Sequence, residues 1–335
     1  MSLAKKLSAP LRAYFNPRFD TIADRLTDIE HRLDVVTSQA GVQDATRQLE
    51  FQSRIDVTNL NARYEPQEFA SERSIAVRAA HFADPAFLRW FELLYDGGME
   101  HHRKPWEYAF VLDRAMRAGV LHPGARAVGF GVGTEPVPAV LASHGVDILA
   151  TDLAPEDAGH WAQSNQHAAG VTSLSFPKIV DDGILAERVR FAAADMNDPV
   201  DGLGRFDLVW SSCAIEHLGS PEAGLDFVLR SAALLEPGGV AVHTTELELT
   251  ARATTADHGH CAVYRPSDVE GLADELRAAG FLIDVNLNVA MESPLDRYVA
   301  LPPYPATDPA HLKLAIFDSV STSFGIAVRR PAVTA

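Results

Sequence analysis

The stretch ARAVGFGVGTEP at residues 125–136 places three glycines, Gly129, Gly131 and Gly133, at alternate positions after an apolar run. The apolar run predicts a β-strand, and PVPAVLASHG, which follows, predicts a helix. A turn between a strand and a helix is where backbone comes close to a ligand and where a Cβ would obstruct it. Asp152 ends the next predicted strand, ILATD, 19 residues after Gly133, where a carboxylate can accept hydrogen bonds from ribose hydroxyls. The stretch therefore predicts a site for a nucleoside-containing cofactor, with a plain turn of an α/β protein as the alternative.

Strands and helices alternate along the rest of the chain. The further predicted strands are VDILATD (146–152), RVRFAAAD (188–195), RFDLVWSS (205–212), GVAVHTTE (239–246), FLIDVNLNV (281–289) and SFGIAVRR (323–330). Helical segments separate most of them, which predicts an α/β fold with a Rossmann-like, mostly parallel sheet and helices on both faces. Ligands of such sheets bind beyond the carboxyl ends of the strands.

Composition narrows the class of protein. The chain has 335 residues, and 47% of them are hydrophobic, which is enough for a well-packed core. The formal net charge of −16 argues against a nucleic-acid partner, because such binding needs a basic surface. Cys213 and Cys261 are too few and too far apart for a disulfide framework or a cysteine zinc site. No apolar run predicts a membrane span or a secretion signal, so we expect a cytoplasmic protein.

The N-terminal part differs from the rest, and we expect two regions: a helical extension over residues 1–65 and a catalytic domain over residues 80–330. Six apolar residues in the extension follow a heptad spacing: Phe19, Ile22, Leu26, Ile29, Leu33 and Val36. The spacing predicts either an amphipathic helix packed on its own domain or a short coiled coil that joins copies into a homo-oligomer. Four basic residues near the start, at positions 5, 6, 12 and 18, predict contact with an anionic membrane surface or with a partner enzyme of glycan assembly.

Three further landmarks follow the glycine turn in order: FAAADMND, FDLVWSSCAIEHL and LLEPGGVAVHT. Together with the turn and Asp152, they resemble the class I S-adenosylmethionine-dependent methyltransferases over about residues 122–250. The resemblance implies a seven-stranded sheet with SFGIAVRR as its antiparallel last strand, and S-adenosyl-L-methionine as the cofactor. The cofactor-binding residues that it implies are Gly129, Gly131, Gly133, Glu135, Asp152, Asp195, Met196 and Ser211.

Two of these positions depart from the family pattern. Gly129 stands where the family usually has an acid, and Glu135 stands where it usually has a further glycine. Glu135 or the segment HHRKPWEY (101–108) is therefore expected to hold the methionine end of the cofactor. Arg103, Lys104 and Trp106 are the candidates in that segment, for the cofactor carboxylate or for a lid, with a solvated helix start as the alternative.

The transfer of a methyl group needs an aligned acceptor and, for a hydroxyl, removal of its proton. His217 beside Glu216 is the predicted catalytic pair, because a histidine titrates near neutral pH. The Glu-His pair also resembles metal-dependent O-methyltransferases of small-RNA ends, which implies a divalent metal on Glu216, His217 and His260. Cys213 stands where those families have a further acid, and Glu246 is the candidate replacement. A purely structural Glu-His pair is the third interpretation.

The acceptor is expected to bind at the long insertion ESPLDRYVALPPYPATDPAHLKL (292–314). It carries polar and aromatic residues suited to a sugar, namely Asp296, Arg297, Tyr298, Tyr304 and His311. The whole chain resembles bacterial methyltransferases associated with surface-glycan biosynthesis, which implies O-methylation of a sugar hydroxyl. The alternatives are another small-molecule or lipid acceptor, a non-catalytic scaffold, and an oxidoreductase with a nicotinamide cofactor.

Overall fold

The computed structural model describes residues 43–333 except 164–165, 199, 258–260 and 306–307. The chain divides into two compact units, Met1–Glu50 and Phe51–Ala335. In the first unit the described residues, 43–50, are helical. The described residues do not include the predicted heptad positions 19–36 or the four basic residues at positions 5, 6, 12 and 18. The predictions about oligomers and membrane contact therefore stay predictions.

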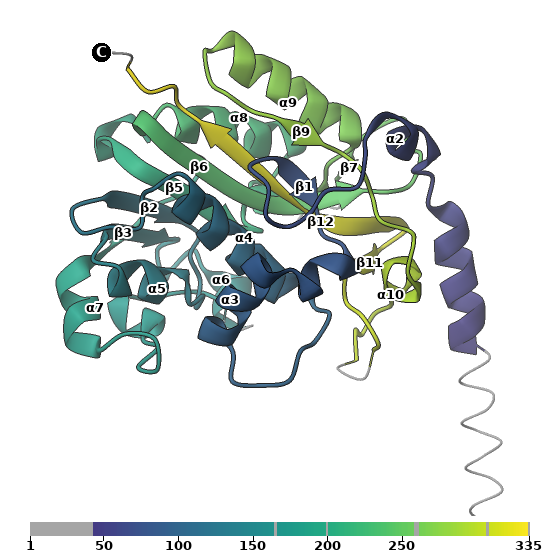
Figure 1. The fold of residues 1–335 in the computed structure, drawn as a ribbon, viewed down its shortest axis with the longest axis horizontal. Helices are drawn as coiled ribbons and strands as arrows, with labels where there is room; N and C mark the ends of the chain where they lie inside the picture. The colour runs from purple at the N-terminus through teal and green to yellow at the C-terminus, as the bar shows by residue number, and fades with distance from the viewer. Residues whose placement is uncertain (1–42, 164–165, 199, 258–260, 306–307, 334–335) are drawn as a thin grey trace, which may run out of the picture. The chain divides into compact units, whose positions relative to one another are not determined.

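A large sheet forms the centre of the second unit (Figure 1). Its strands run in the order β10-β11-β12-β6-β5-β2-β3-β4, and β1 pairs with β12 and with β9. Their bounds are β1 (Ser74–Ala76), β2 (Arg126–Phe130), β3 (Asp147–Asp152), β4 (Val189–Ala193), β5 (Phe206–Ser212), β6 (Leu235–Glu248), β9 (Val285–Asn286), β10 (Val299–Ala300), β11 (Lys313–Ile316) and β12 (Ser319–Arg329). A separate hairpin pairs β7 (Ala256–Asp257) with β8 (Ala262–Val263).

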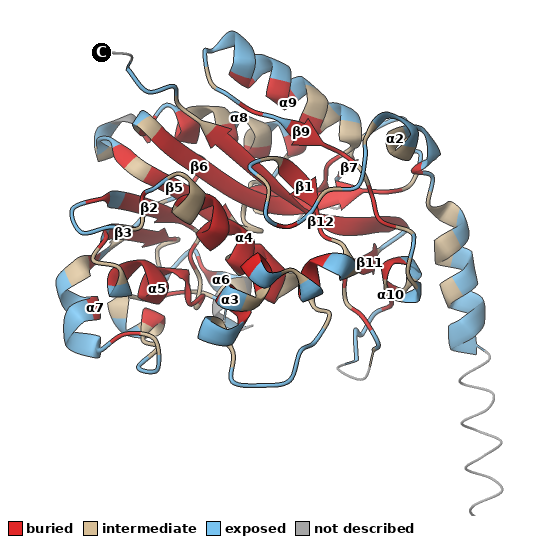
Figure 2. Ribbon diagram, viewed as in Figure 1, coloured by how far each residue is buried: buried red, intermediate tan, exposed pale blue. Residues whose placement is uncertain are grey.

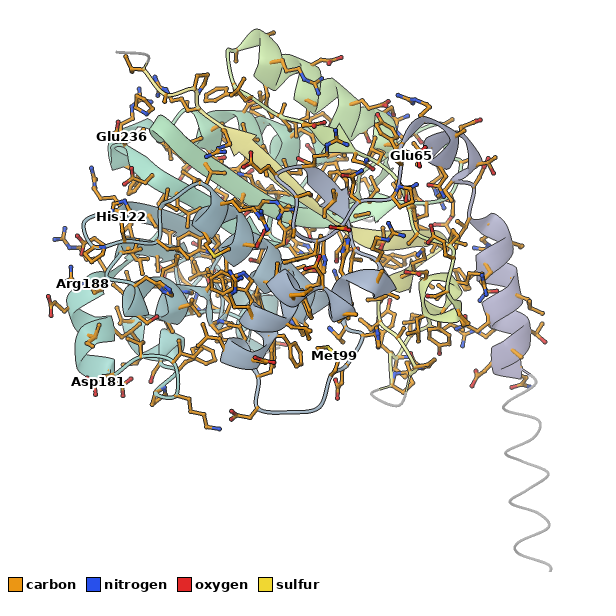
Figure 3. The ribbon with its side chains drawn as sticks, viewed as in Figure 1. Glu65, Met99, His122, Asp181, Arg188 and Glu236 are labelled. Atoms are coloured by element: carbon orange, nitrogen blue, oxygen red, sulfur yellow. The ribbon has the colours of Figure 1, made fainter. Side chains whose placement is uncertain are left out.

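The strands from β4 to β6 are all parallel, as the sequence predicts, and β12 runs antiparallel to β6. Figure 3 shows the consequence at one edge of this unit. His122, Arg188 and Glu236, which stand at or just before the starts of β2, β4 and β6, lie along the same edge. The carboxyl ends of these strands therefore meet at the opposite edge, where a ligand is expected.

Helices cover both faces of the sheet. The α-helices are α2 (Thr58–Arg63), α3 (Pro85–Leu94), α4 (Arg103–Arg117), α5 (Val137–Ser143), α6 (Gly159–Gln163), α7 (Asp182–Arg188), α8 (Pro221–Ala232), α9 (Pro266–Ala278) and α10 (Pro294–Arg297). Short 3₁₀ turns are η2 (Ala79–Ala83), η3 (Val171–Leu174), η4 (Asp201–Leu203) and η5 (Ile215–His217).

Successive residues of the central strands pack in different hydrophobic clusters, one on each face of the sheet. Ala127 and Trp210 pack in the cluster that contains α4 and α5, whereas Val128 and Val209 pack in the cluster that contains α8 and α9. This is the alternation of a strand that is buried on both faces. Figure 2 accordingly shows β5, β6 and β12 almost entirely buried.

The predicted count of seven strands was wrong, because the described residues form a ten-stranded sheet. The additional strands β1, β10 and β11 lie on the side of β12 that faces away from β6. β11 pairs with the first part of β12 and β1 with Phe324 and Gly325, so they satisfy backbone groups that a bare edge would leave unpaired. The predicted strand at 281–289 shortens to the two residues of β9, which pairs with β1.

Helix α4 is fixed tightly on the sheet. Its Phe110 ring lies so close to β12 that a Cβ at Gly325 would meet the ring at 2.4 Å. Trp106, one turn earlier, stacks on Phe110 and donates a hydrogen bond from Nε1 to His81. This packing fixes the first turn of α4, which holds Arg103 and Lys104.

Among the helices that the structure describes, none combines the length and the apolar character that a membrane crossing needs.

Candidate active site

A cavity of about 500 Å³ lies at the carboxyl ends of β2, β3, β4 and β5. Residues from the ends of all four strands line it, together with residues of α4 and of the region around α6. The turn after β2 contributes residues 131–135, β3 ends at the cavity with Asp152, and residues 194–197 follow β4. The turn after β5 adds residues 212–214, His217 and Leu218. The remaining wall consists of Lys104 and Tyr108 on α4 and of Leu153, Asp157, Trp161 and Gln166 around α6.

The glycine turn requires its glycines. Gly131 and Gly133 have φ angles of 57° and 51°, in the left-handed region that disfavours other residues. A Cβ on Gly133 would lie 2.5 Å from the carbonyl oxygen of Gln166, and one on Gly131 would lie 3.0 Å from Cβ of Ala214. The turn therefore packs closely against neighbouring parts of the cavity wall, and the predicted approach to a ligand stays a prediction.

Asp152 anchors this turn to the end of β3. Its Oδ2 accepts hydrogen bonds from the N–H groups of Gly133 and Ala168, both at 3.0 Å, and its Oδ1 accepts one from Leu153 at 2.8 Å. A carboxylate has about four acceptor positions, so Asp152 keeps one for a ligand in the cavity. The structure thus gives Asp152 a structural function beside the predicted contact with ribose.

Asp195 and Met196 lie together on the wall after β4. Asp195 is exposed and accepts a hydrogen bond from the N–H of Asn197 at 2.8 Å. Met196 is buried, and its sulfur would lie 3.5 Å from a Cβ on Gly131. An acceptor next to an apolar surface is the combination predicted for an adenine.

Neighbouring residues of η5 have different surroundings. His217 lines the cavity, and its ring packs edge-on against Trp161 with centroids 4.6 Å apart. Glu216 does not line the cavity: it is buried and accepts a hydrogen bond from Oγ1 of Thr245 at 3.0 Å. Burial raises the pKa of Glu216. Of the predicted catalytic pair, only His217 is open to a ligand in this cavity.

Two predicted cofactor residues also lie outside the cavity lining. Gly129 is inside β2, where a Cβ would meet the ring of Trp210 at 2.2 Å, so glycine is needed there for packing. Ser211 is buried within β5 and its Oγ lies 2.8 Å from Nδ1 of His243. Because side chains alternate along a strand, it is Ser212 that lines the cavity.

Helix α4 and the glycine turn supply charged groups at one part of the cavity. Lys104 lines it, with Nζ 2.9 Å from Oε2 of Glu107. Glu135 also lines it but is only 4% exposed, and its Oε1 accepts a hydrogen bond from Nε1 of Trp210 at 2.6 Å. Burial raises the pKa of Glu135 to about 7. Trp106, a candidate from the same segment, is instead a fully buried core residue.

A buried cluster of charges adjoins this part of the cavity, and sequence reasoning did not find it as a unit. The guanidinium of Arg103 contacts Glu246 and lies 3.2 Å from Glu107. Ser321 donates to Glu246 at 2.8 Å, and Ser323 donates to Glu107 at 2.5 Å. The charge of Arg103 thus compensates the two carboxylates in the protein interior, where an isolated charge would lower the stability of the fold. Glu246 is 143 positions from Arg103, so no local motif indicates the pair.

Cys213 connects the cluster to the cavity. It follows β5, lines the cavity, and has a φ of 51°, an unusual angle for a residue with a side chain. Its sulfur lies 3.7 Å from Nη1 of Arg103. Burial raises the pKa of this thiol well above its usual value, which disfavours the nucleophilic thiolate.

The predicted metal site is not formed by the described residues. His260 lies outside them, while Glu216 and His217 have separate surroundings. Ligand atoms of Cys213, Glu216 and Glu246 do lie within 4.8 Å of one another. However, one oxygen of Glu246 is taken by Arg103 and the other by Ser321. A guanidinium already supplies the positive charge there, so this group does not fit a divalent cation.

Comparison with known proteins supports the class of domain that the fold and the cavity indicate. A family model described as a methyltransferase domain matches residues 128–243, which run from β2 into β6. No curated protein matches the chain. The chain therefore contains a methyltransferase domain with the class I, Rossmann-like fold of the S-adenosylmethionine-dependent enzymes.

Solved structures also resemble the chain at low identity. Magnesium protoporphyrin IX methyltransferase from Synechocystis PCC 6803, with bound S-adenosylmethionine, is 16% identical with a TM-score of 0.38 over 75% of this chain and 94% of that one. The CcbJ methyltransferase from Streptomyces caelestis is 15% identical with a TM-score of 0.37 over 65% of this chain and 93% of that one.

Proposed function

We propose that the protein transfers a methyl group from S-adenosylmethionine to a hydroxyl of a small-molecule acceptor, of the class of sugars found in cell-surface glycans. The observation that carries the proposal is the cavity at the strand ends, with its glycine turn, Asp152, and the pair Asp195-Met196. These groups occur in the order and places that a nucleoside cofactor needs.

The lining residues fit the cofactor. The turn at Gly131 and Gly133 lines the cavity with backbone, and a Cβ at either glycine would press against Ala214 or Gln166 and displace that wall. The remaining acceptor position of Asp152 faces the ribose, and Asp195 accepts from the adenine amino group while Met196 covers its face. When bound, S-adenosylmethionine supplies a methyl group activated on a sulfonium. The protein needs to bind it, exclude water and align the acceptor.

His217 is proposed to take the proton of the acceptor hydroxyl, because it is the histidine that lines this cavity within the described part of the chain. Glu216 is proposed as a positioning residue, since its carboxylate is buried against Thr245 and holds the turn that carries His217. A divalent metal on Glu216, His217 and His260 stays a prediction, because His260 lies outside the described residues.

The acceptor class is proposed from an aromatic group that includes His102, the neighbour of Arg103 in the chain, and lies outside the residues that line the cavity. The rings of His102 and His311 stack with centroids 4.4 Å apart, and Tyr304 packs edge-on against His311 at 5.4 Å. Flat rings with polar edges suit an acceptor that carries hydroxyls. Other residues of the insertion have structural contacts instead: Asp296 is buried and caps α10, and the hydroxyl of Tyr298 donates to Asp308.

The proposal is tested first by calorimetric titration with S-adenosylhomocysteine, the demethylated product. We expect one site per chain with micromolar affinity. The next step is transfer of a labelled methyl group to a panel of sugars, lipids and other hydroxyl compounds, with and without a chelator. Absence of binding at millimolar ligand would reject the methyltransferase function and favour a scaffold. Transfer to a nitrogen acceptor alone would reject the hydroxyl.

A further inference from the structure

We infer that the part of the cavity between α4 and the glycine turn holds the amino-acid end of the cofactor, with Lys104 binding its carboxylate and Glu135 its ammonium. The inference rests on the proposed function, because it names the residues of this chain that recognise one end of that ligand. It also gives one physical reason for the two departures of the glycine turn from the family pattern.

Lys104 is a cation at the cavity wall. Tyr108, one helical turn later, lines the same cavity, so this face of α4 is directed at the ligand. An ammonium has three N–H donors, and the contact of Lys104 with Oε2 of Glu107 is an ion pair without hydrogen-bond geometry. Arg103 and Ser323 also contact Glu107, so its charge does not depend on Lys104 alone. Lys104 can therefore share its charge with a carboxylate in the cavity.

Glu135 is a carboxyl group held in place by Trp210. The Nε1–H of Trp210 donates to Oε1 of Glu135, and the ring that carries it occupies the space beside Gly129. An acid at position 129 would overlap this ring, because even a Cβ there would lie 2.2 Å from it. Glycine at 129 therefore admits Trp210, and Trp210 orients Glu135. Position 129 therefore lacks an acid, and Glu135 provides one instead. The indole of Trp210 contacts both positions.

The charges of the cavity complement the ligand. The amino-acid end of S-adenosylmethionine carries one negative and one positive group, and this part of the cavity offers one ammonium and one carboxyl group. Burial raises the pKa of Glu135 to about 7, which indicates that its carboxylate lacks a full countercharge. The ammonium of the ligand would supply that charge.

A pair of ligands separates this contact from the rest of the site. S-adenosylhomocysteine and 5′-methylthioadenosine share the nucleoside and the sulfur, but only the first has the amino-acid end. Both are titrated by calorimetry into the wild-type chain, Lys104→Met and Glu135→Gln. Glutamine keeps an acceptor for Trp210, and methionine keeps the length of the side chain without its charge. Asp195→Asn serves as the control at the nucleoside end.

We expect Lys104→Met and Glu135→Gln each to weaken S-adenosylhomocysteine binding about tenfold, the effect of losing one charged hydrogen bond. The affinity of both variants for 5′-methylthioadenosine should stay within about twofold of the wild type, because this ligand lacks the group that the two residues bind. Asp195→Asn should weaken both ligands alike. If Lys104→Met fails to fold, the nearly isosteric Glu135→Gln decides.

Equal loss of both ligands in Glu135→Gln, or no loss of either, would overturn the inference and leave the proposed function intact. Failure of the wild-type chain to bind either ligand would overturn the proposed function and the inference with it. Wild-type binding of both ligands with the same affinity would reject the inference alone.

Discussion

Replacing Gly133 by alanine tests whether the glycine turn is a ligand-binding approach of backbone or an ordinary turn. The substitution adds one methyl group, which would lie 2.5 Å from the carbonyl oxygen of Gln166. Gly119 provides a matched control, because it also has a positive φ, 76° against 51°, but no atom within 4 Å of its Cβ position. It follows the last turn of α4, at the opposite end of that helix from Lys104.

Both substitutions incur the cost of a side chain in the left-handed region, about 1 kcal/mol. Gly133→Ala incurs a second cost, because the methyl group and a backbone oxygen must separate by roughly 0.5–1 Å, and such overpacking costs about 1–3 kcal/mol. We therefore expect unfolding free energies lower by about 1 kcal/mol for Gly119→Ala and about 2–4 kcal/mol for Gly133→Ala. For a chain of this size each kcal/mol shifts Tm by about 2 °C.

Calorimetric titration with S-adenosylhomocysteine then separates the two interpretations. The displaced turn should weaken binding in Gly133→Ala by about tenfold or more, since a shift of this size breaks close backbone contacts. Gly119→Ala should bind as the wild type does. Wild-type affinity in Gly133→Ala, with the loss of Tm confirmed, would show that the turn does not contact the ligand.

Three further substitutions test other parts of the site. Asp152→Asn should lower the unfolding free energy without ligand by about 1–3 kcal/mol, because an amide has a single oxygen and its NH2 group cannot accept from the backbone N–H that faces the other carboxylate position; a denaturant melt at neutral pH measures it. The pKa of Glu135 is about 7 in the folded chain, above its ordinary value of 4.5. The folded state therefore holds the proton more tightly, and stability falls as pH rises from about 5 to 7, by about 3 kcal/mol from this group. Glu135→Gln should remove that part of the slope, and parallel slopes in melts of the two proteins from pH 5 to 8 would contradict it. His217→Ala should bind S-adenosylhomocysteine normally but lose about 100-fold or more in turnover; full activity in a labelled-methyl assay would make His217 structural.

The grouping of the candidate nucleoside-binding residues could be predicted because these residues come from successive strand ends. A parallel sheet brings these ends to one edge, so positions 131–135, Asp152 and Asp195 lie together whatever the details of packing. The alternation of predicted strands and helices also predicted that the strands from β4 to β6 run parallel. Periodicity alone did not predict β1, because a strand of three residues has too few positions to show an alternation.

The charged part of the site could not be predicted in the same way. Arg103 pairs with Glu246, and Glu107 accepts from Ser323, 216 positions away. In the sequence each of these residues is only one charge or hydroxyl among many. Their burial follows from the packing of α4 on β6 and β12, and tertiary packing is not encoded in local spacing. In the same packing Trp106 lies in the core and Lys104 lines the cavity, although the two residues are nearly adjacent in the sequence.

Gly129 and Glu135 show where sequence reasoning reaches its limit within a single motif. Each could be recognised as a departure from the expected pattern, because that needs only the position of a residue in the motif. Their connection requires the indole of Trp210, which lies 75 positions from Glu135 and reaches it only because β2 and β5 are neighbours in the sheet. Glycine at 129 without Glu135 would leave the part of the cavity between α4 and the glycine turn without a carboxyl group, and a glutamate at 135 without Trp210 would lack the donor that orients it. The two positions are therefore best understood as one unit with Trp210, and a departure from a motif is a reason to look across the neighbouring strand before a site is judged to be lost.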